Sequence, residues 1–160
     1  MKTVLVSAAI LVDADGRILI AQRPEGKPMA GYWEFAGGKV EAGETPEAAL
    51  VRELEEELGI ETSENCFSPL SFISHIYYRS PPPATPEIPG LCPGGVSHSW
   101  HPELKEEFHL LMMCYVCRKW LGTITPQEGQ AVRWVRPQEL YNISMPPADV
   151  PLIPVLIERL

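Results

Sequence analysis

The segment from Gly38 to Ile60 constrains this chain more strongly than any other part of the sequence. Thr45 is a favourable N-cap residue, Pro46 suits the first helical position, and Gly59 suits the residue at which a helix ends. The sequence therefore predicts a helix that runs to about Leu58. Apolar side chains recur along it at Leu50, Val51, Leu54 and Leu58. This helical spacing predicts one face that packs against a sheet.

Three carboxylates lie three and four residues apart on the same helix, at Glu53, Glu56 and Glu57. Residues at these spacings share one helix face, and like charges placed there repel each other. A divalent cation turns that repulsion into binding. Mg²⁺ prefers carboxylate oxygens and keeps water and substrate phosphates as its remaining ligands. The spacing indicates a magnesium site for phosphate chemistry, with a solvated acidic helix face as the alternative.

The segment also fits the pattern GX5EX7REUXEEXGU, in which U is aliphatic, at every fixed position. The matching residues are Gly38, Glu44, Arg52, Glu53, Leu54, Glu56, Glu57, Gly59 and Ile60. The chain resembles the Nudix hydrolases and, within them, the MutT-like nucleoside triphosphate pyrophosphohydrolases of the 8-oxo-dGTP diphosphatase type. The wider likeness runs from the N-terminus to about Tyr78 and again from Phe108 to the C-terminus.

This resemblance implies a metal centre and roles for its residues. Glu53, Glu56 and Glu57 are expected to bind Mg²⁺, for which Mn²⁺ is a substitute, with the carbonyl of Gly37 as a further ligand. Glu53 is also expected to act as general base, either directly or by orienting the attacking water. Arg52 is expected to orient the glutamates through ion pairs, and a nearby arginine keeps carboxylates ionised for metal binding.

Two residues outside the segment extend the implied site. Glu128, in the sequence TPQEGQAV, is expected to bind metal or to help activate water, with an exposed loop glutamate as the alternative. Arg23 is expected to reach the phosphates, because a guanidinium matches the geometry of phosphate oxygens. A plain surface arginine is the alternative at that position.

The base pocket is implied by two further stretches. Trp33–Gly37 resembles the family's W-E-F-P-G, so substrate contacts are expected at Glu34, Phe35, Ala36 and Gly37, with Ala36 in place of the usual proline. Asp149 lies in MPPADVPLIP, similar to a MutT-like segment whose asparagine reads the base. An ionised carboxylate only accepts hydrogen bonds, so Asp149 offers the base no donor unless it is protonated. A helix N-cap is the alternative role.

The activity that these residues imply is Mg²⁺-dependent hydrolysis of a (deoxy)nucleoside triphosphate to the monophosphate and pyrophosphate. The expected substrate is 8-oxo-dGTP, which would place the chain in nucleotide-pool sanitation, in support of DNA replication and repair. The same chemistry on a pyrimidine triphosphate such as CTP or dCTP is the first alternative. A non-catalytic nucleotide-binding module is the second, although such modules typically lose one or more of the glutamates retained here.

Composition limits the partners. The formal net charge of −8 lacks the basic footprint of a protein that binds a nucleic-acid polymer, whereas a free nucleotide bridged by metal remains compatible. The apolar stretch after Lys2 is interpreted as a first strand rather than a signal peptide, and no segment predicts a membrane span. We expect a cytoplasmic protein, with monomer and homodimer both open.

The resemblance implies an α+β fold, a Nudix-type α/β/α sandwich with a mixed central sheet, in one domain over residues 1–160. Strands are predicted at Thr3–Val12, Arg17–Gln22, Tyr32–Phe35, Phe67–Tyr78, Phe108–Trp120 and Val132–Val135, and later helices at Pro137–Tyr141 and Pro151–Leu160. Cys114 and Cys117 are interpreted as buried structural thiols.

A Pro-rich insert at about 79–107 shows no apolar periodicity and is predicted to be a long loop. A mobile flap or an interaction surface is the expected role. A zinc clip through Cys92, His98 and His101 is the weaker alternative, because their spacing fits no familiar zinc module.

Overall fold

The computed structural model describes residues 1–92 and 96–160. Its strands are β1 (Lys2–Leu11), β2 (Ile18–Gln22), β3 (Trp33–Glu34), β4 (Ala36–Lys39), β5 (Ser68–Tyr78), β6 (Ser97–Trp100), β7 (Phe108–Cys117) and β8 (Val132–Val135). Its α-helices are α1 (Pro46–Leu58) and α2 (Ile153–Arg159), and short 3-10 helices are η1 (Glu64–Cys66), η2 (Pro137–Asn142) and η3 (Val150–Leu152). No helix among these described residues is long and apolar enough to cross a membrane.

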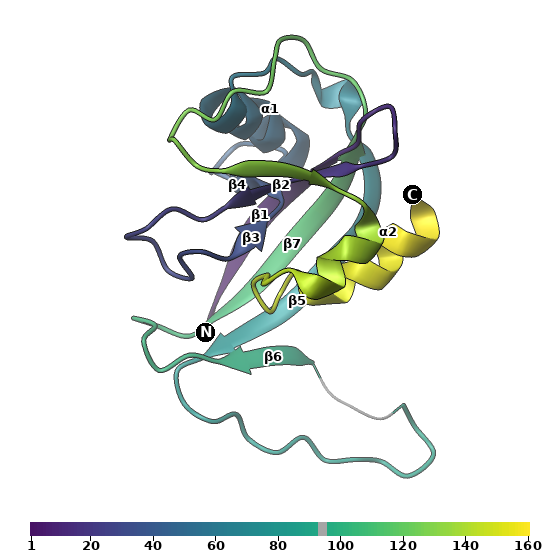
Figure 1. Ribbon diagram of the computed structural model, residues 1–160. Helices are drawn as coiled ribbons and strands as arrows, with labels where there is room; N and C mark the ends of the chain where they lie inside the picture. Colours follow the sequence, from purple (N-terminus) through teal and green to yellow (C-terminus); the bar gives the residue numbers. More distant parts are fainter. Residues whose placement is uncertain (93–95) are drawn as a thin grey trace.

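The central sheet has five strands in the order β4-β1-β7-β5-β6. It is mixed, because β1 runs parallel to β7 and β5 parallel to β6, while the other neighbours are antiparallel. A second, three-stranded sheet has the order β3-β2-β8. Figure 1 shows α1 over one side of the central sheet and α2 on the other. The predicted α+β sandwich with a mixed central sheet is confirmed.

Helix α1 forms for the reasons that the sequence predicts. The Thr45 hydroxyl accepts a hydrogen bond from the Ala48 amide at 3.1 Å, and Gly59 ends the helix in the left-handed region at φ 66°. Leu50, Leu54 and Leu58 are fully buried in the core beneath the helix. Burial of each such side chain contributes about 2 kcal/mol, so the apolar face fixes which side of the helix is left for chemistry.

Two predicted elements differ in detail, and one strand is additional. The helix predicted at Pro137–Tyr141 is the 3-10 helix η2, and the one at Pro151–Leu160 divides into η3 and α2. Pro154 lacks the amide hydrogen that a continuous α-helix starting at Pro151 would need at its fourth position, whereas Pro151 itself is tolerated in the first turn. Strand β4 was not predicted, because its sequence AGGK has low strand propensity, and pairing with β1 supplies the missing stability.

The prediction of a structureless insert at 79–107 is wrong in one part. Strand β6 lies inside it and extends the sheet beside β5 (Figure 1). His75 of β5 is only 1% exposed, and its two ring nitrogens hydrogen-bond to the Ser97 and Ser99 hydroxyls, both at 2.8 Å. These side-chain bonds add to the parallel strand pairing. No apolar periodicity in the sequence predicts them. Residues 93–95 of the insert lie outside the described residues.

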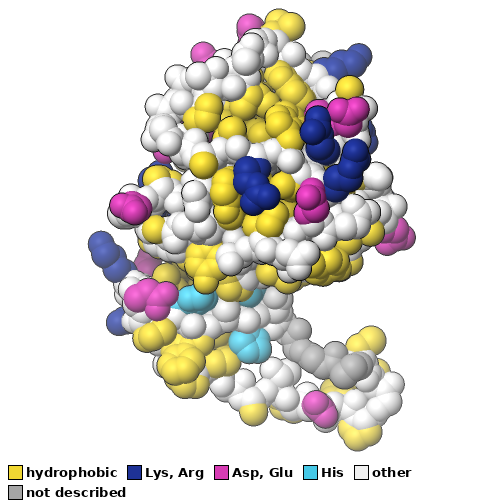
Figure 2. All heavy atoms as spheres, in the orientation of Figure 1, with side chains coloured by type: hydrophobic (Ala, Val, Ile, Leu, Met, Phe, Trp, Pro, Cys, Tyr) yellow, Lys and Arg dark blue, Asp and Glu magenta, His cyan; other side chains and the backbone are white. Residues whose placement is uncertain are grey.

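The remainder of the insert carries apolar side chains on its surface. Ile88, Leu91, Val96 and Trp100 are all exposed. Figure 2 shows hydrophobic side chains along the arm below the sheet. His98 bonds to the Val96 carbonyl and His101 to Ser99 and Glu103, and the described residues form no cluster of three metal-ligating side chains. The structure therefore gives no support to a zinc clip.

We predict that protonation of His75 at acidic pH lowers the free energy of unfolding and destabilises the pairing of β6 with β5. Burial lowers the pKa of His75 to about 4, assisted by His101 and His98, so the folded state keeps the ring neutral while the unfolded chain protonates near pH 6.5. Stability present at neutral pH is therefore lost as pH falls from about 6.5 toward 4, by on the order of 2 kcal/mol. Urea unfolding at several pH values measures this slope.

His75→Gln is expected to flatten the pH slope, even where it lowers absolute stability. His109→Gln is the matched control, because His109 lies on the adjacent strand β7 and is only half-buried. An unchanged slope in His75→Gln would remove His75 as the source of the pH dependence.

Candidate active site

A cleft of about 410 Å³ opens between α1, the two sheets and the loop before β8. Most of the predicted site residues line it: Arg23, Glu34, Phe35, Gly37, Glu53, Glu57, Glu128 and Asp149. They come from segments far apart in the sequence, and the fold brings these predicted site residues together in one cleft. Arg52, Glu56 and Ala36 are not part of the cleft wall. The Ala36 side chain is buried in the core on the α1 side.

Two glycines allow the cleft floor to approach the helix closely. Gly37 has φ 148°, and a Cβ atom there would collide with the Ser7 carbonyl oxygen of β1. A Cβ atom on Gly38 would lie 2.5 Å from the carboxylate of Glu53. Any side chain at these positions would push the backbone and the carboxylate apart, which explains the glycines physically.

The carboxyl groups of Glu53 and Glu57 contact each other in the cleft. Burial raises the pKa of Glu57 to about 8, and the neighbouring Glu53, which hydrogen-bonds to it, raises it further. The Gly37 amide donates to Glu57 and opposes this shift. Two touching carboxyl groups repel each other when both are ionised, and a bound cation would relieve that repulsion.

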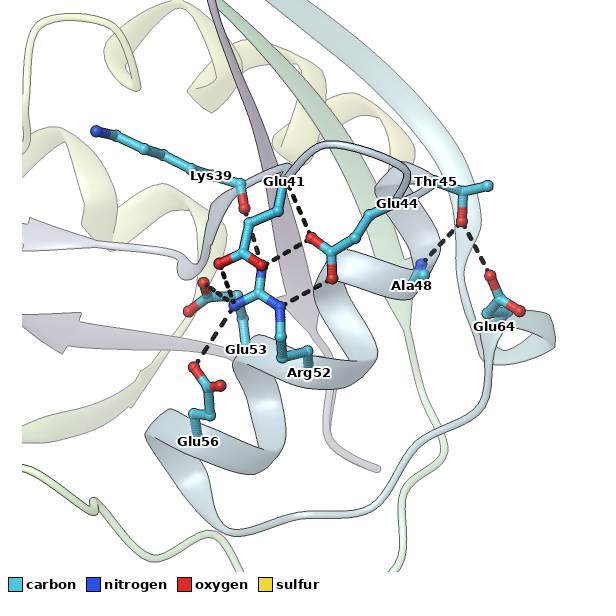
Figure 3. A network of polar contacts seen from close by, with 9 residues as sticks. All are labelled: Lys39, Glu41, Glu44, Thr45, Ala48, Arg52, Glu53, Glu56 and Glu64. Carbon is cyan, nitrogen blue, oxygen red and sulfur yellow. Dashed lines mark hydrogen bonds and ion pairs between the residues drawn. The ribbon is translucent and has the colours of Figure 1, made fainter.

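Arg52 holds this arrangement from behind the cleft (Figure 3). Its guanidinium donates to both Glu44 oxygens at 2.8 and 2.9 Å and to Glu53 Oε1 at 2.8 Å. It also donates to the Lys39 carbonyl at 3.1 Å, next to the glycine pair. Arg52 lowers the pKa of Glu44 to about 2. The arginine thereby ties the glycine strand, the loop and the helix into one unit.

Glu56 and Glu128 stand apart from the carboxyl pair. Glu56 is 61% exposed at its side chain and faces Arg52 at 3.5 Å (Figure 3). Glu128 lies on the loop before β8, where its carboxylate is 3.4 Å from the Lys27 ammonium. In residues 1–92 and 96–160 no three acidic, histidine or cysteine side chains converge closely enough to enclose a metal ion. The predicted ligands therefore form an open set.

The open set suits one class of metal. Every candidate ligand is an oxygen, from the carboxylates of Glu53, Glu56, Glu57 and Glu128 or from the Gly37 carbonyl, and Glu53 and Glu57 touch each other. Mg²⁺ and Mn²⁺ accept such hard ligands, and Mg²⁺ keeps several positions for water and phosphate rather than requiring a full protein cage. The residues present fit a divalent ion that is completed by substrate.

A second group of residues in the cleft has a different character. Arg23 donates to Glu34 Oε2 at 2.8 Å and to the Pro28 carbonyl at 2.7 Å, which fixes its guanidinium at the wall. Asp149 is only 6% exposed, and burial, followed by the charge of Glu34, raises its pKa to about 8. Burial thus favours the protonated form of Asp149, which offers a base one hydrogen-bond donor that the ionised form lacks. Its side chain makes no helix-capping bond, so the N-cap alternative is not observed.

Several residues of the cleft are not predicted from the sequence. Ser7 is fully buried, lines the cleft, and its hydroxyl has no hydrogen-bond partner among the described residues, so it is available to a ligand. Lys27, Lys39 and Gln130 also line the cleft. Lys39 follows the Gly37-Gly38 pair directly, which is a signal that could have identified it. Ser7 gave no signal, because a serine in a strand is usually unremarkable.

The NUDIX domain model matches residues 1–156 of the chain. The CTP pyrophosphohydrolase of Escherichia coli is 39% identical over 153 residues, which cover 96% of this chain and 90% of that protein. The 8-oxo-dGTP diphosphatase of Haemophilus influenzae is 33% identical over 158 residues, covering 99% and 94%.

Solved structures agree with this likeness. The solution structure of the E. coli ORF135 protein is 33% identical with a TM-score of 0.69, covering 99% of this chain and 91% of that one. A MutT structure, from work on the enzymes of Aliivibrio salmonicida and Vibrio cholerae, is 29% identical with a TM-score of 0.68. It covers 99% of this chain and 100% of that one.

We predict that Glu57 makes Mg²⁺ binding pH-dependent. Because the raised pKa keeps Glu57 protonated below about pH 8, the metal must displace a proton, and Mg²⁺ affinity should rise between about pH 6.5 and 8. Glu57→Gln is expected to weaken Mg²⁺ binding by about tenfold or more and to flatten this rise. Calorimetric titration in buffers of different ionisation enthalpy measures both the affinity and the released proton.

Glu55→Gln is the matched control, because Glu55 is an exposed glutamate on the same helix and does not line the cleft. Equal Mg²⁺ affinities in Glu57→Gln and Glu55→Gln would exclude Glu57 from the ligand set.

Proposed function

Because this chain belongs to the Nudix family and is a nucleoside triphosphate pyrophosphohydrolase, we propose that it hydrolyses 8-oxo-dGTP with Mg²⁺ as cofactor. The products would be 8-oxo-dGMP and pyrophosphate, and the role would be nucleotide-pool sanitation. A role of this kind acts where free nucleotides are used, so we infer a cytoplasmic location and no nucleic-acid polymer as partner. The observation that carries the proposal is a cleft that contains both a carboxyl pair and a buried Asp149 whose pKa is raised by burial.

The Glu53–Glu57 carboxyl pair would supply the hydrolytic chemistry. A bound divalent ion would neutralise phosphate charge and make water a better nucleophile. Glu53, held at 2.8 Å by Arg52, is positioned to accept the proton of the attacking water. Arg52 is a positioning residue here, because it touches Glu53 and Glu44 rather than the cleft. Arg23, Lys27 and Lys39 are the cations in the cleft that the chain itself offers to the phosphates.

Asp149 would supply the selectivity for one base over another. A protonated carboxyl offers one O–H donor and one carbonyl acceptor. In 8-oxoguanine, N7 carries a hydrogen beside the O6 acceptor, which is the complementary pattern. Unmodified guanine presents two acceptors, N7 and O6, on that same edge, so one hydrogen bond would be lost. A buried site left with an unpaired polar group disfavours such a ligand strongly.

A pyrimidine triphosphate is the second candidate, and a specific finding favours it. The E. coli relative that is 39% identical over nearly the whole chain is a CTP pyrophosphohydrolase. Cytosine presents the N4 amino donor beside the N3 acceptor, and a protonated Asp149 complements that edge as well. The two candidates share the metal chemistry and differ only in the base.

We predict a preference that a substrate panel can measure. Steady-state kcat/KM with Mg²⁺ is compared for 8-oxo-dGTP, dGTP, CTP, dCTP and the remaining natural nucleotides, with product identification. The proposal expects 8-oxo-dGTP to exceed dGTP by about tenfold or more, because one buried hydrogen bond separates them. A maximum at CTP or dCTP would establish the second candidate instead, and nucleotide binding without turnover would indicate a non-catalytic module.

Glu53→Gln is the control for contaminating phosphatases. It should lose about a hundredfold or more in kcat while still binding nucleotide, because it removes the base and preserves the shape. An active Glu53→Gln would overturn the assignment of Glu53.

A pH experiment tests the role of Asp149. The ratio of kcat/KM of the wild-type protein to that of Asp149→Asn, both for 8-oxo-dGTP, cancels ionisations at the metal centre, which the two proteins share. Asp149→Asn carries a donor and an acceptor at every pH. Because the Asp149 donor to O6 exists only below its pKa of about 8, the ratio should fall as pH rises through that value. A ratio that is constant from about pH 7 to 9 would contradict this role.

A further inference from the structure

The Ser7 hydroxyl is a buried polar group in the wall of the active-site cleft with no hydrogen-bond partner. The residue is 0% exposed and lines the cleft, and its Oγ atom bonds to no residue in 1–92 or 96–160. A hydroxyl taken out of water without a partner costs free energy, so buried hydroxyls are normally paired. An unpaired one in a cleft wall indicates a partner that arrives with a ligand.

Strand register places the Ser7 side chain next to the Glu53 carboxylate. Ser7 of β1 lies directly opposite Gly38 of β4 in an antiparallel pair. Side chains at directly opposite positions leave the sheet on the same face, with their Cβ atoms roughly 5 Å apart. A Cβ atom on Gly38 would lie 2.5 Å from the Glu53 carboxylate carbon. The Ser7 hydroxyl therefore lies beside this carboxylate without bonding to it.

Packing alone does not explain a serine at this position. Helix α1 packs on β4 and β1 (Figure 1), and the side chains of β1 on that face change character along the strand. Leu5 is exposed, whereas Ala9 and Leu11 are buried in the core beneath the helix. Ser7 lies between them, where the packed face meets the cleft. An alanine would fill the same place and leave no buried polar group unpaired.

The neighbouring groups restrict the chemistry of the missing partner. A hydroxyl donates one hydrogen bond and accepts two, so water and phosphate oxygens both suit it. The touching carboxyl groups of Glu53 and Glu57 suit a divalent ion, and such an ion keeps water and phosphate oxygens as its remaining ligands. An oxygen atom of one of these two kinds would therefore be brought next to Ser7.

We propose that the Ser7 hydroxyl takes part in the hydrolytic reaction by hydrogen-bonding a water or phosphate oxygen at the Glu53–Glu57 carboxyl pair. A water molecule between Ser7 and Glu53 would have two fixed acceptors for its hydrogens, which orients its lone pairs toward phosphorus. A phosphate oxygen would instead accept the Ser7 hydrogen. The inference rests on the divalent cofactor of the proposed function, and it does not depend on which base the nucleotide carries.

The test is Ser7→Ala, which removes the hydroxyl and keeps the small side chain. Without metal, its urea midpoint should equal or exceed that of the wild-type protein, because an unpaired buried hydroxyl gives no net stabilisation. Mg²⁺ affinity is then measured by calorimetry, with and without saturating pyrophosphate. Affinity weakened about fivefold for Mg²⁺ alone identifies the partner as water, and weakened affinity only with pyrophosphate identifies it as a phosphate oxygen.

Thr62→Val is the matched control. Thr62 carries the other buried hydroxyl that has no partner among the described residues, and it does not line the cleft. The control should leave Mg²⁺ binding as in the wild-type protein. Equal Mg²⁺ affinities in Ser7→Ala and Thr62→Val, both with and without pyrophosphate, would overturn the inference. A urea midpoint lowered in Ser7→Ala alone would also overturn it, because the hydroxyl would then be paired within the protein itself.

These binding measurements separate the inference from the proposed function, because they use no nucleotide and stay decisive if 8-oxo-dGTP is not the substrate. Turnover of the best nucleotide substrate adds a second readout. Ser7→Ala should lower kcat about tenfold with little change in KM if the partner is water, and should raise KM if it is a phosphate oxygen. Values of kcat and KM equal to those of Thr62→Val would exclude Ser7 from the reaction.

Discussion

The Arg52 guanidinium is the interaction on which the active-site region depends. It donates hydrogen bonds to both carboxylate oxygens of Glu44, to one oxygen of Glu53 and to the carbonyl of Lys39. One planar, permanently charged group therefore connects three backbone segments. Lysine has no such planar group and could not join them. With the helix fixed in this way, Glu53 is held against the glycine strand, and the absence of a side chain at Gly38 allows that close approach.

Burial of two acids in the cleft is the second common theme. Glu57 and Asp149 both have a pKa raised to about 8, chiefly because water is excluded from them. In the proposed function the consequences differ because the ligands differ. A cation would replace the proton at Glu57, whereas the proton at Asp149 would be the donor that meets the edge of the base. The same exclusion of water would then favour metal binding at one residue and base recognition at the other.

The insert shows how a polar anchor can replace an apolar one. Its exposed apolar residues do not pack on the body, and the strand that does, β6, is held by backbone pairing and by serine hydroxyls around a buried histidine. The segment that follows returns beside the cleft, where Lys105 joins Lys2, Lys27 and Lys39 along one groove. A feature that looks like an interruption of the fold therefore forms one wall of a basic groove next to the active site.

The sequence by itself determined the helix, its caps, its buried face and the family, because spacing along one helix is a local property that residue types report directly. It also predicted the mixed sandwich. It missed β4, whose glycines are stabilised only by pairing with β1, and β6, whose anchor lies on another strand. It left the ionisation of Asp149 open and did not identify Ser7 or the cluster of lysines beside the cleft. Burial, protonation and the convergence of four lysines depend on distant segments meeting, so only the tertiary structure decided them.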